Sequence, residues 1–478
     1  QELALLFAIT EEEILAIKKQ VKSQRNFRQV IIRQRLTEQE VALFSVNRHR
    51  LTGVDVVGRL SRHYPHGALF AHTIGYVGRI NERDEKRIDK QNYKGTLHIG
   101  KTGIEKQYEA HLHGQVGSQQ VERNVRGRVV RSLERLAPEA GSDLFLHLDI
   151  GLQRVAADAL ADYNGAIIAL DPKTGGVLTM VSKPDFDPNS FVNGISTKDY
   201  ALLNTSIDRP LFDRALRGHY PPGSTLKPFV ALAGLELGVI NKKYSSFCPG
   251  WYSLPNKEHR YRCWKKHGHG SVDVMSAIAQ SCDVYFYDLA HSLGIDRMHS
   301  FLDLFGFGHR TGIDIPSESR GLSPSREWKR NNRNQAWYPG ETLISGIGQG
   351  FNQTTPIQLA YATAILAMRG AAIRPSVVLA TRAAGQEQLQ LSEKKLGEDL
   401  PMEDSQQWEA VFDAMEEVTH GRRGTARHIA KGLPFKMAGK TGTAQVFTIK
   451  QDEEYNADEL DRKLHDHALF IAFAPVDD

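Results

Sequence analysis

The sequence has no long apolar run, no excess of one charge and few cysteines. No stretch of about 18 consecutive apolar residues occurs in its 478 residues, so no segment of this chain is predicted to span a bilayer. The 60 Lys and Arg residues nearly balance 56 Asp and Glu, and the net charge of +4 with no long basic run argues against nucleic acid as the main partner. Three cysteines are too few for a disulfide framework.

What the sequence does contain is an ordinary globular composition, with 41% hydrophobic and 24% charged residues and no internal repeat. The length suggests about two or three domains. Residues 1–141 are rich in His, Arg and Gly and carry short alternating runs, which predicts an extended, strand-rich first domain; the runs are 29–32, 71–77 and 126–131.

The pattern changes near residue 142, where we place the start of a second domain, 142–478. Asp149 is a candidate N-cap for a helix over 149–163, and the two apolar runs around DPKTGG predict a hairpin. Further helices are predicted at 226–238, 272–293, 356–369 and 406–419, and a last hairpin at 441–447 and 468–474. This order predicts an α+β fold whose antiparallel sheet is closed by distant segments.

Several short motifs are decoys. Residues 95–102 read GTLHIGKT and match a phosphate-binding loop, but 87–94 are almost wholly polar and cannot form the buried strand that such a loop needs. Two K-T-G triplets, at 101–103 and 173–175, fall in that segment and in the hairpin turn. The S-x-x-K match at 392–395 lies in a charged stretch without an apolar face.

A second S-x-x-K match, Ser224 to Lys227, has a better context. A serine hydroxyl is a weak nucleophile until a base takes its proton, and residues i and i+3 share one helix face. Pro228 is tolerated in a first turn, and the apolar run 229–237 predicts a buried helix. The pattern indicates a reactive serine with a lysine base; the plain alternative is that Ser224 only caps the helix.

Two further motifs follow in the chain. In AGKTGTAQV, strand alternation places Lys440 and Gly442 on one face, where the lysine can hold a carboxylate and the glycine leaves room for another backbone. Ser281 and Asp283 lie in a stretch predicted to be helical from about Val272, where by themselves they would be only a polar patch.

The order of the three motifs resembles the serine penicillin-recognising enzymes, whose S-x-x-K, S-D-N and K-T-G motifs follow in the same order. Segments YPPGSTLKP (220–228), GIGQG (346–350) and AGKTGTAQV (438–446) resemble the transpeptidase domain of class B penicillin-binding proteins, and 72–80 and 99–114 resemble the non-catalytic pedestal of that class. The segment 249–270 and Asp283, where the superfamily usually has Asn, resemble the elongation-type group.

The resemblance implies a peptidoglycan D,D-transpeptidase, inhibited by β-lactams, that crosslinks stem peptides through a serine acyl-enzyme. It implies that Ser224 is the nucleophile, Lys227 is its base and Ser281 relays the proton, while Asp283 orders the lysine and the substrate amide. Lys440, Thr441 and Thr443, beside Gly442, would bind the substrate carboxylate. The N–H groups of Ser224 and Thr443 would form the oxyanion hole. The alternatives are a penicillin-binding carboxypeptidase, β-lactamase or sensor, or a protein that acts chiefly as a scaffold.

The three cysteines lie between Cys248 and Cys282, with three histidines among them. Cys248, Cys263, Cys282 and one histidine could form the Cys₃His set of a structural zinc site, although the spacing is unlike that of a zinc finger. One disulfide with a free thiol, or three inert thiols, are the competing interpretations. The resemblance favours zinc, with His269 rather than His267 as the fourth ligand.

The resemblance also implies partners and a location. Members of the family are held in the bacterial inner membrane by an N-terminal anchor, have the catalytic domain in the periplasm, and contact a membrane glycan polymerase and scaffold proteins of the elongation machinery. They also continue with another strand and a terminal helix. We therefore expect the anchor and this C-terminal end to lie outside the present chain.

Overall fold

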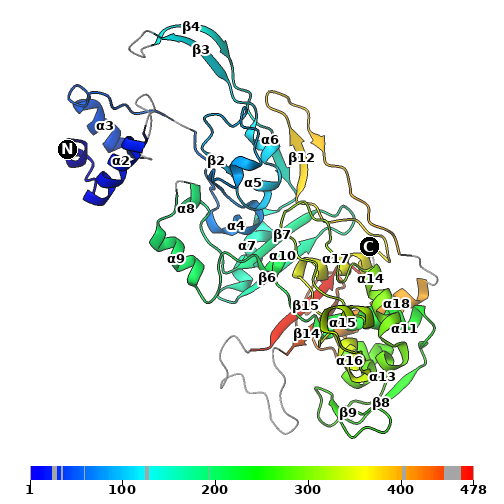
Figure 1. The fold of residues 1–478 in the computed structure, drawn as a ribbon. Helices are drawn as coiled ribbons and strands as arrows, with labels where there is room; N and C mark the ends of the chain where they lie inside the picture. The colour runs from blue at the N-terminus through cyan, green and yellow to red at the C-terminus, as the bar shows by residue number, and fades with distance from the viewer. Residues whose placement is uncertain are drawn as a thin grey trace.

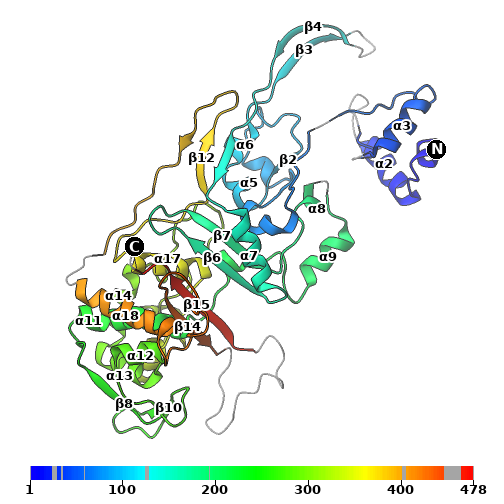
Figure 2. The ribbon, with the colours of Figure 1, turned by 180° about the vertical axis from the view of Figure 1, so that it is seen from behind.

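The molecule is elongated, with a small helical lobe near the N-terminus, a central region and a large helical lobe (Figure 1). This computed structural model describes residues 2–23, 30–33, 36–58, 60–123, 129–192, 194–400, 405–445 and 465–476. The hairpin of β3 (Ser118–Arg123) and β4 (Val129–Leu136) projects beyond the central region, and the view from behind shows the same arrangement (Figure 2).

The first lobe contains α1 (Glu2–Leu6), α2 (Glu11–Ser23) and α3 (Glu38–Asn47). Its small core is formed by Phe7, Phe44 and Leu51. A capping box between Thr37 and Glu40 starts α3 by satisfying two backbone N–H groups that the helix itself leaves unpaired.

The next elements are short: η1 (Gly67–Phe70), α4 (Ala71–Ile74), β1 (Val77–Arg79), η2 (Asp84–Lys86), β2 (His98–Gly100), α5 (Gly103–Gln107) and α6 (Glu109–His113). The prediction of a strand at 71–77 was wrong for its first half, because α4 occupies it and ends at Gly75, whose φ is 78°. A Cβ atom at Gly75 would lie 2.0 Å from Thr102 O, so only glycine lets this turn pack against the start of α5. Residues 30–32 are also not a strand.

The central region begins with β5 (Asp143–Leu146), which pairs with β12 (Val378–Arg382), and β12 also pairs with β13 (Gln390–Leu391). Asp149 caps α7 (Ile150–Leu160) as predicted, since its side chain accepts the N–H of Leu152. The predicted hairpin is β6 (Gly165–Leu170) with β7 (Val177–Lys183), and three short helices follow: α8 (Asn189–Val192), α9 (Thr197–Thr205) and α10 (Arg214–Arg217). The domain start at residue 142 stays a prediction.

The large lobe carries the main hydrophobic core. Its helices are η3 (Gly223–Leu226), α11 (Lys227–Glu236), α12 (Val274–Ala279), α13 (Asp283–Leu293), α14 (Ile295–Leu304), α15 (Arg326–Arg333), α16 (Pro339–Gly346), α17 (Pro356–Ala367) and α18 (Ser405–His420). Its strands are β8 (Ser245–Cys248), β9 (Trp251–Tyr252), β10 (Tyr261–Arg262), β11 (Gly270–Asp273), β14 (Ala438–Ala444) and β15 (His467–Phe473). Phe229, Tyr285 and Trp408 are among the fully buried side chains, each of which stabilises the fold by about 1.5–3 kcal/mol.

The α+β fold class is confirmed, and the predicted hairpin of β14 and β15 is antiparallel. Val446 and Phe447 of the predicted strand lie outside the described residues. Closure into one sheet is not seen within the described ranges, where β6–β7 and β14–β15 form separate ladders. Helix α17 packs against both β6 and β15 and so connects the two hairpins. No helix among the described residues is both long and apolar enough to cross a membrane.

Candidate active site

Ser224 lies in η3, a 3₁₀ turn that leads directly into α11. The backbone N–H of Lys227 donates to the carbonyl of Ser224, and residues i and i+3 of such a turn eclipse one another. Ser224 is half-buried, whereas Lys227 is fully buried. Pro228 stands in the first turn of α11, where the sequence pattern places it. The S-x-x-K motif therefore starts a buried helix, as predicted.

Lys227 joins this turn to the middle motif. Its Nζ atom donates to Asp283 Oδ1 at 2.7 Å, to the Ser281 carbonyl at 2.9 Å and to Ser281 Oγ at 3.2 Å. An ammonium group has three protons, so these three acceptors match its full donor capacity. Two motifs that are 54 residues apart in the chain thus meet at one buried nitrogen.

The middle motif is not part of a continuous helix, and the prediction of one helix over 272–293 was wrong. Helix α12 ends at Ala279, and α13 begins at Asp283 with Cys282 as its N-cap. Between them Ser281 has a φ of 57°, a left-handed conformation that is costly for a residue with a side chain. Sequence periodicity missed this break because the helices on both sides of it are rich in apolar residues.

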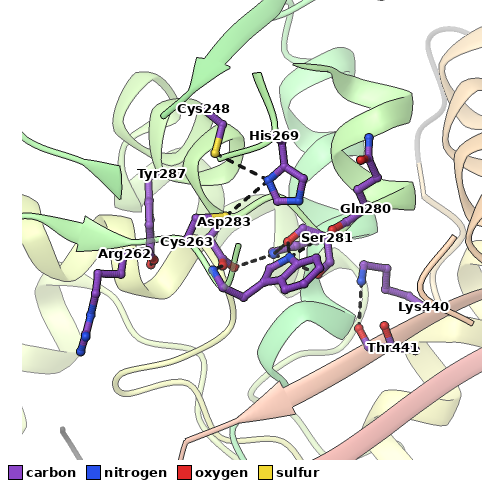
Figure 3. A network of polar contacts seen from close by, with 12 residues as sticks. Cys248, Arg262, Cys263, His269, Gln280, Ser281, Asp283, Tyr287, Lys440 and Thr441 are labelled. Atoms are coloured by element: carbon purple, nitrogen blue, oxygen red, sulfur yellow. Dashed lines mark hydrogen bonds and ion pairs between the residues drawn. The ribbon is translucent and has the colours of Figure 1, made fainter. Parts of the chain in front are cut away.

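Asp283 is a buried carboxylate that accepts from two sides. Oδ1 accepts from Lys227, and Oδ2 accepts the backbone N–H of Trp264 at 2.9 Å. Figure 3 shows Asp283 beside Ser281, with Lys440 approaching from the neighbouring strand. A carboxylate is acceptor-only at neutral pH, which suits a position between two donors.

Lys440 lies on β14, and its side chain is fully buried. Its Nζ atom donates to the carbonyl of Thr441 at 2.9 Å. Burial lowers the pKa of Lys440 well below its usual range, and the nearby charge of Lys227 adds to this effect. Thr441 Oγ1 lies 2.7 Å from Thr425 Oγ1, and Thr443 is exposed.

Glycines bring the motifs into contact. A Cβ atom at Gly442 would lie 2.8 Å from Thr225 Cγ2, so this glycine makes room for η3 rather than for a separate chain. A Cβ atom at Gly223 would lie 2.7 Å from Thr443 O, and Gly223 N–H donates to Gly348 O at 2.9 Å. GIGQG is thus a fourth contributor to the site, and its three glycines were the signal for such close packing.

The three cysteines and His269 form a compact cluster at the ends of β8, β10 and β11 and at the start of α13. Their ligand atoms all lie within 4.8 Å of one another. His269 Nδ1 is 3.6 Å from both Cys248 Sγ and Cys263 Sγ (Figure 3). His267, the other histidine considered, is exposed and lies outside the cluster.

No sulfur in the cluster is bonded to another, and all three thiols are buried. A hydrogen bond from the Cys282 thiol, with a smaller contribution from His269, lowers the pKa of Cys263 to about 3. Burial raises the pKa of Cys248. Polar atoms of this kind are usually paired, yet His269 Nε2 is buried without a hydrogen-bond partner among the described residues.

Trp264 is the residue that sequence reasoning passed over. It lies in the quoted segment 249–270, directly after Cys263, and it donates hydrogen bonds to both residues of the middle motif. Its position after a candidate metal ligand was the available signal.

Comparisons with known proteins agree with this geometry. Residues 165–478 match the penicillin binding protein transpeptidase domain, and residues 1–146 match the penicillin-binding protein dimerisation domain. The peptidoglycan D,D-transpeptidase MrdA of Acinetobacter baumannii is 45% identical over 478 residues, which are 100% of this chain and 70% of that protein.

Two solved structures are also similar. Pseudomonas aeruginosa PBP2 in complex with WCK 5153 has 49% identity and a TM-score of 0.77, covering 88% of this chain and 84% of that one. The complex of PBP2 and MreC from Helicobacter pylori has 30% identity and a TM-score of 0.83, covering 99% and 84%. The resemblance seen in the motifs is thereby confirmed, and the chain belongs to the penicillin-binding protein family, in the PBP2 group whose members are named MrdA.

Proposed function

We propose that this protein is a peptidoglycan D,D-transpeptidase in which Ser224 forms an acyl-enzyme with a stem peptide. The observation that carries the assignment is the buried Lys227 ammonium group, which stands one turn after Ser224 and contacts both Ser281 and Asp283. If Ser224 only capped the helix, Lys227 would need none of these contacts.

In the first half-reaction, Ser224 Oγ bonds to the carbonyl carbon of the penultimate D-Ala, and the bond to the terminal D-Ala nitrogen breaks. Lys227, reacting as the neutral amine, accepts the proton of Ser224. Ser281 Oγ, 3.2 Å from Lys227 Nζ, passes a proton to the leaving amine and is reprotonated by Lys227. Asp283 holds the lysine in place. The N–H groups of Ser224 and Thr443 would stabilise the oxyanion, a contribution commonly worth about 3–4 kcal/mol per donor.

In the second half-reaction, an amine of a neighbouring stem peptide attacks the acyl-enzyme. Its proton passes to Lys227 and from there to Ser224, which leaves as the hydroxyl, so the crosslink forms and the enzyme is restored. Lys440 supplies the positive charge for the substrate carboxylate, and the hydroxyls of Thr441 and Thr443 are the polar groups beside it. A β-lactam would acylate Ser224 and stall before the second step.

The test is mass spectrometry of the intact protein after treatment with benzylpenicillin. We expect one adduct, mapped to Ser224, and no adduct on a Ser224→Ala variant. Ser392→Ala is the matched control, since Ser392 opens the other S-x-x-K match in an exposed stretch. An adduct on Ser224→Ala that equals wild type would refute both the transpeptidase and the penicillin-binding hydrolase. Crosslinking of stem peptides, rather than release of D-Ala alone, separates these two.

We further propose that the Cys248, Cys263, His269 and Cys282 side chains hold a structural zinc ion. Tetrahedral zinc has ligand distances of about 2.3 Å to sulfur and about 2.0 Å to nitrogen, which separate sulfur and nitrogen by roughly 3.5 Å. The observed separations of 3.6 Å fit this geometry. When bound, the ion would supply folding energy and tie Cys282, between Ser281 and Asp283, to the 248–269 segment.

Elemental analysis of protein purified without chelator tests the zinc site. We expect about one zinc per chain in wild type and in His267→Ala, and loss of zinc in His269→Ala. Removing the metal with a chelator should lower both the melting temperature and the rate of acylation. Less than about 0.2 zinc per chain, together with a mapped Cys–Cys bond, would refute the zinc site and favour the disulfide.

We also propose a membrane location and partners for the whole protein. The family resemblance supports an inner-membrane anchor with the catalytic domain in the periplasm. The solved complex of a PBP2 with MreC supports an MreC-like protein as a partner. We propose that the 1–141 domain binds it, and that a membrane glycan polymerase is a second partner. Co-purification with an MreC homologue, lost when the 1–141 surface is altered, would test the first partner.

A further inference from the structure

Trp264 is a mostly exposed aromatic residue whose N–H groups point into the catalytic motif. The side chain is 60% exposed, so it contributes little to a hydrophobic core. Nevertheless its backbone N–H donates to Asp283 Oδ2 at 2.9 Å, and its indole Nε1–H lies 3.0 Å from the Ser281 carbonyl and 3.1 Å from the Gln280 carbonyl. One exposed residue thus contacts three successive parts of the break between α12 and α13.

The indole contact acts where the backbone is strained. Ser281 has a φ of 57°, and non-glycine residues in this region carry a cost of order 1–2 kcal/mol. Such a conformation persists when its surroundings hold it in place. The Ser281 carbonyl accepts from Lys227 Nζ at 2.9 Å on one side and from the Trp264 indole on the other. These two donors fix the direction of that carbonyl and so the place of the Ser281 side chain.

The backbone contact acts on Asp283. A carboxylate with only one donor can rotate about its side-chain bonds, and either oxygen can then face the lysine. Because Trp264 N–H occupies Oδ2, Oδ1 is left facing Lys227 Nζ at 2.7 Å. The contacts of Trp264 therefore act on two of the three acceptors that hold the lysine, the Ser281 carbonyl and Asp283 Oδ1.

The indole ring also lies against the thiol cluster. Its centroid is 5.4 Å from the His269 ring in an edge-on arrangement, and Trp264 directly follows Cys263. Figure 3 shows Asp283 and Ser281 between Cys263 and Lys440. Trp264 thus contacts both the thiol cluster and the catalytic motif.

We infer that Trp264 is a positioning residue for acylation, acting through Ser281 and Asp283 on Lys227. The inference rests on the proposed roles of Ser224 and Lys227. It predicts that loss of the indole N–H slows the chemical step, because the base and the proton relay lose their geometry, while non-covalent capture of penicillin is retained.

The sharpest test replaces only the indole N–H, by incorporating β-(3-benzothienyl)alanine at position 264, whose sulfur has nearly the same shape but donates no hydrogen bond. We expect the first-order acylation rate constant for benzylpenicillin to fall about tenfold, with the dissociation constant of the initial complex and the melting temperature unchanged. Incorporation of 7-azatryptophan, which keeps the N–H, should restore the wild-type rate. The same replacement at Trp251, a neighbouring tryptophan that is 38% exposed and stacks on Arg260, is the matched control and should have no effect.

Three outcomes would overturn the inference. The first is an unchanged acylation rate in the position-264 isostere. The second is a loss of rate in the Trp251 control as large as that at position 264. The third is a loss of rate at position 264 that comes with a lowered melting temperature. In each case a Ser224→Ala variant that fails to label leaves the proposed function intact. If Ser224→Ala labels normally, the proposed function itself has failed, which distinguishes the two failures.

Discussion

At the residue scale, the chemistry of the site depends on two buried lysines with different surroundings. Lys227 has a carboxylate partner in Asp283, whereas Lys440, among the residues that the structure describes, donates only to a backbone carbonyl. Burying a charge is costly unless it is paired, so the two lysines compete for the same carboxylate charge. The lowered pKa of Lys440 is the consequence of its burial and of the neighbouring lysine.

The first prediction concerns the charge of Lys440. Lys440→Met, which keeps most of the side-chain volume, should slow acylation by penicillin at least tenfold, about 1.4 kcal/mol in transition-state terms. Lys440→Ala should slow it similarly and also lower the melting temperature, since the side chain is fully buried and its removal leaves a cavity. Normal acylation by the methionine variant would show that this lysine does not capture the carboxylate.

The second prediction is a pH dependence. Lys440 loses its charge as the pH rises through its folded-state pKa, which is lowered, so the second-order rate of acylation should fall at a lower pH than the usual value for lysine, about 10.4. Over that same window the unfolded chain binds more protons than the folded one, so the contribution of Lys440 to stability rises with pH. The two effects have opposite signs.

Rate profiles for wild type and Lys440→Arg, with parallel unfolding curves, check this prediction. Arginine stays protonated, so its variant should keep its activity to higher pH. If the pH–rate profiles of wild type and Lys440→Arg superimpose, the fall in acylation rate at high pH comes from another group.

At the scale of elements, the site is an edge contact between η3 and β14, with α12 and α13 behind it. Gly223 and Gly442 permit this contact because a side chain at either position would meet backbone or side-chain atoms within 3 Å. Because η3 and β14 lie this close together, the N–H groups of Ser224 and Thr443, which are proposed for the oxyanion hole, lie on adjoining segments.

The third prediction tests that contact. Gly223→Ala should slow acylation more than tenfold, because its Cβ atom would lie 2.7 Å from Thr443 O and push β14 away from η3. The control is Gly238→Ala, which also has a positive φ, 63° against 54°, but no atom within 4 Å of the added Cβ. Both should lose about 1–2 kcal/mol from the backbone conformation, as measured by chemical denaturation. Equal acylation rates in the two variants would contradict the prediction.

At the scale of the whole molecule, Asp314 joins the two domains. Its carboxylate accepts the Val377 N–H at 2.6 Å, the Val378 N–H at 3.0 Å and the Ser376 hydroxyl at 3.2 Å. It also accepts the hydroxyl of Tyr108, from the pedestal segment, at 2.8 Å. Removing the carboxylate would leave buried N–H groups unpaired.

The fourth prediction separates these contacts. Asp314→Ala should lower the free energy of unfolding by about 3 kcal/mol or more, since unsatisfied buried donors cost about 1–3 kcal/mol each. Tyr108→Phe removes one of several hydrogen bonds between the domains, among which Thr73 Oγ1 to the Met180 carbonyl is another, and should broaden the thermal transition while preserving each domain. Tyr93→Phe is its control, because the Tyr93 hydroxyl bonds to Glu109 within the pedestal. An equally broadened transition in Tyr93→Phe would show that the Tyr108 contact has no special role at the junction.

Local rules determined a large part of this protein. The spacing of Ser224 and Lys227, the proline in the first turn of α11, the cap at Asp149 and the strand pairs around the DPKTGG turn all depend on residues within a few positions of one another. Such features follow from backbone geometry and can be read without knowledge of the fold. The motif order and the resemblance that it carries were sufficient to predict the family.

Only the tertiary structure decided where these local pieces meet. The left-handed Ser281, the burial of Lys440 and the contacts of Trp264 all depend on partners distant in the chain. Periodicity reports which face of a helix is apolar, but it carries no information on which distant segment will pack there. Gly442 illustrates the difference, because the sequence shows that space is needed at that position, and only the packed fold shows that η3 fills it.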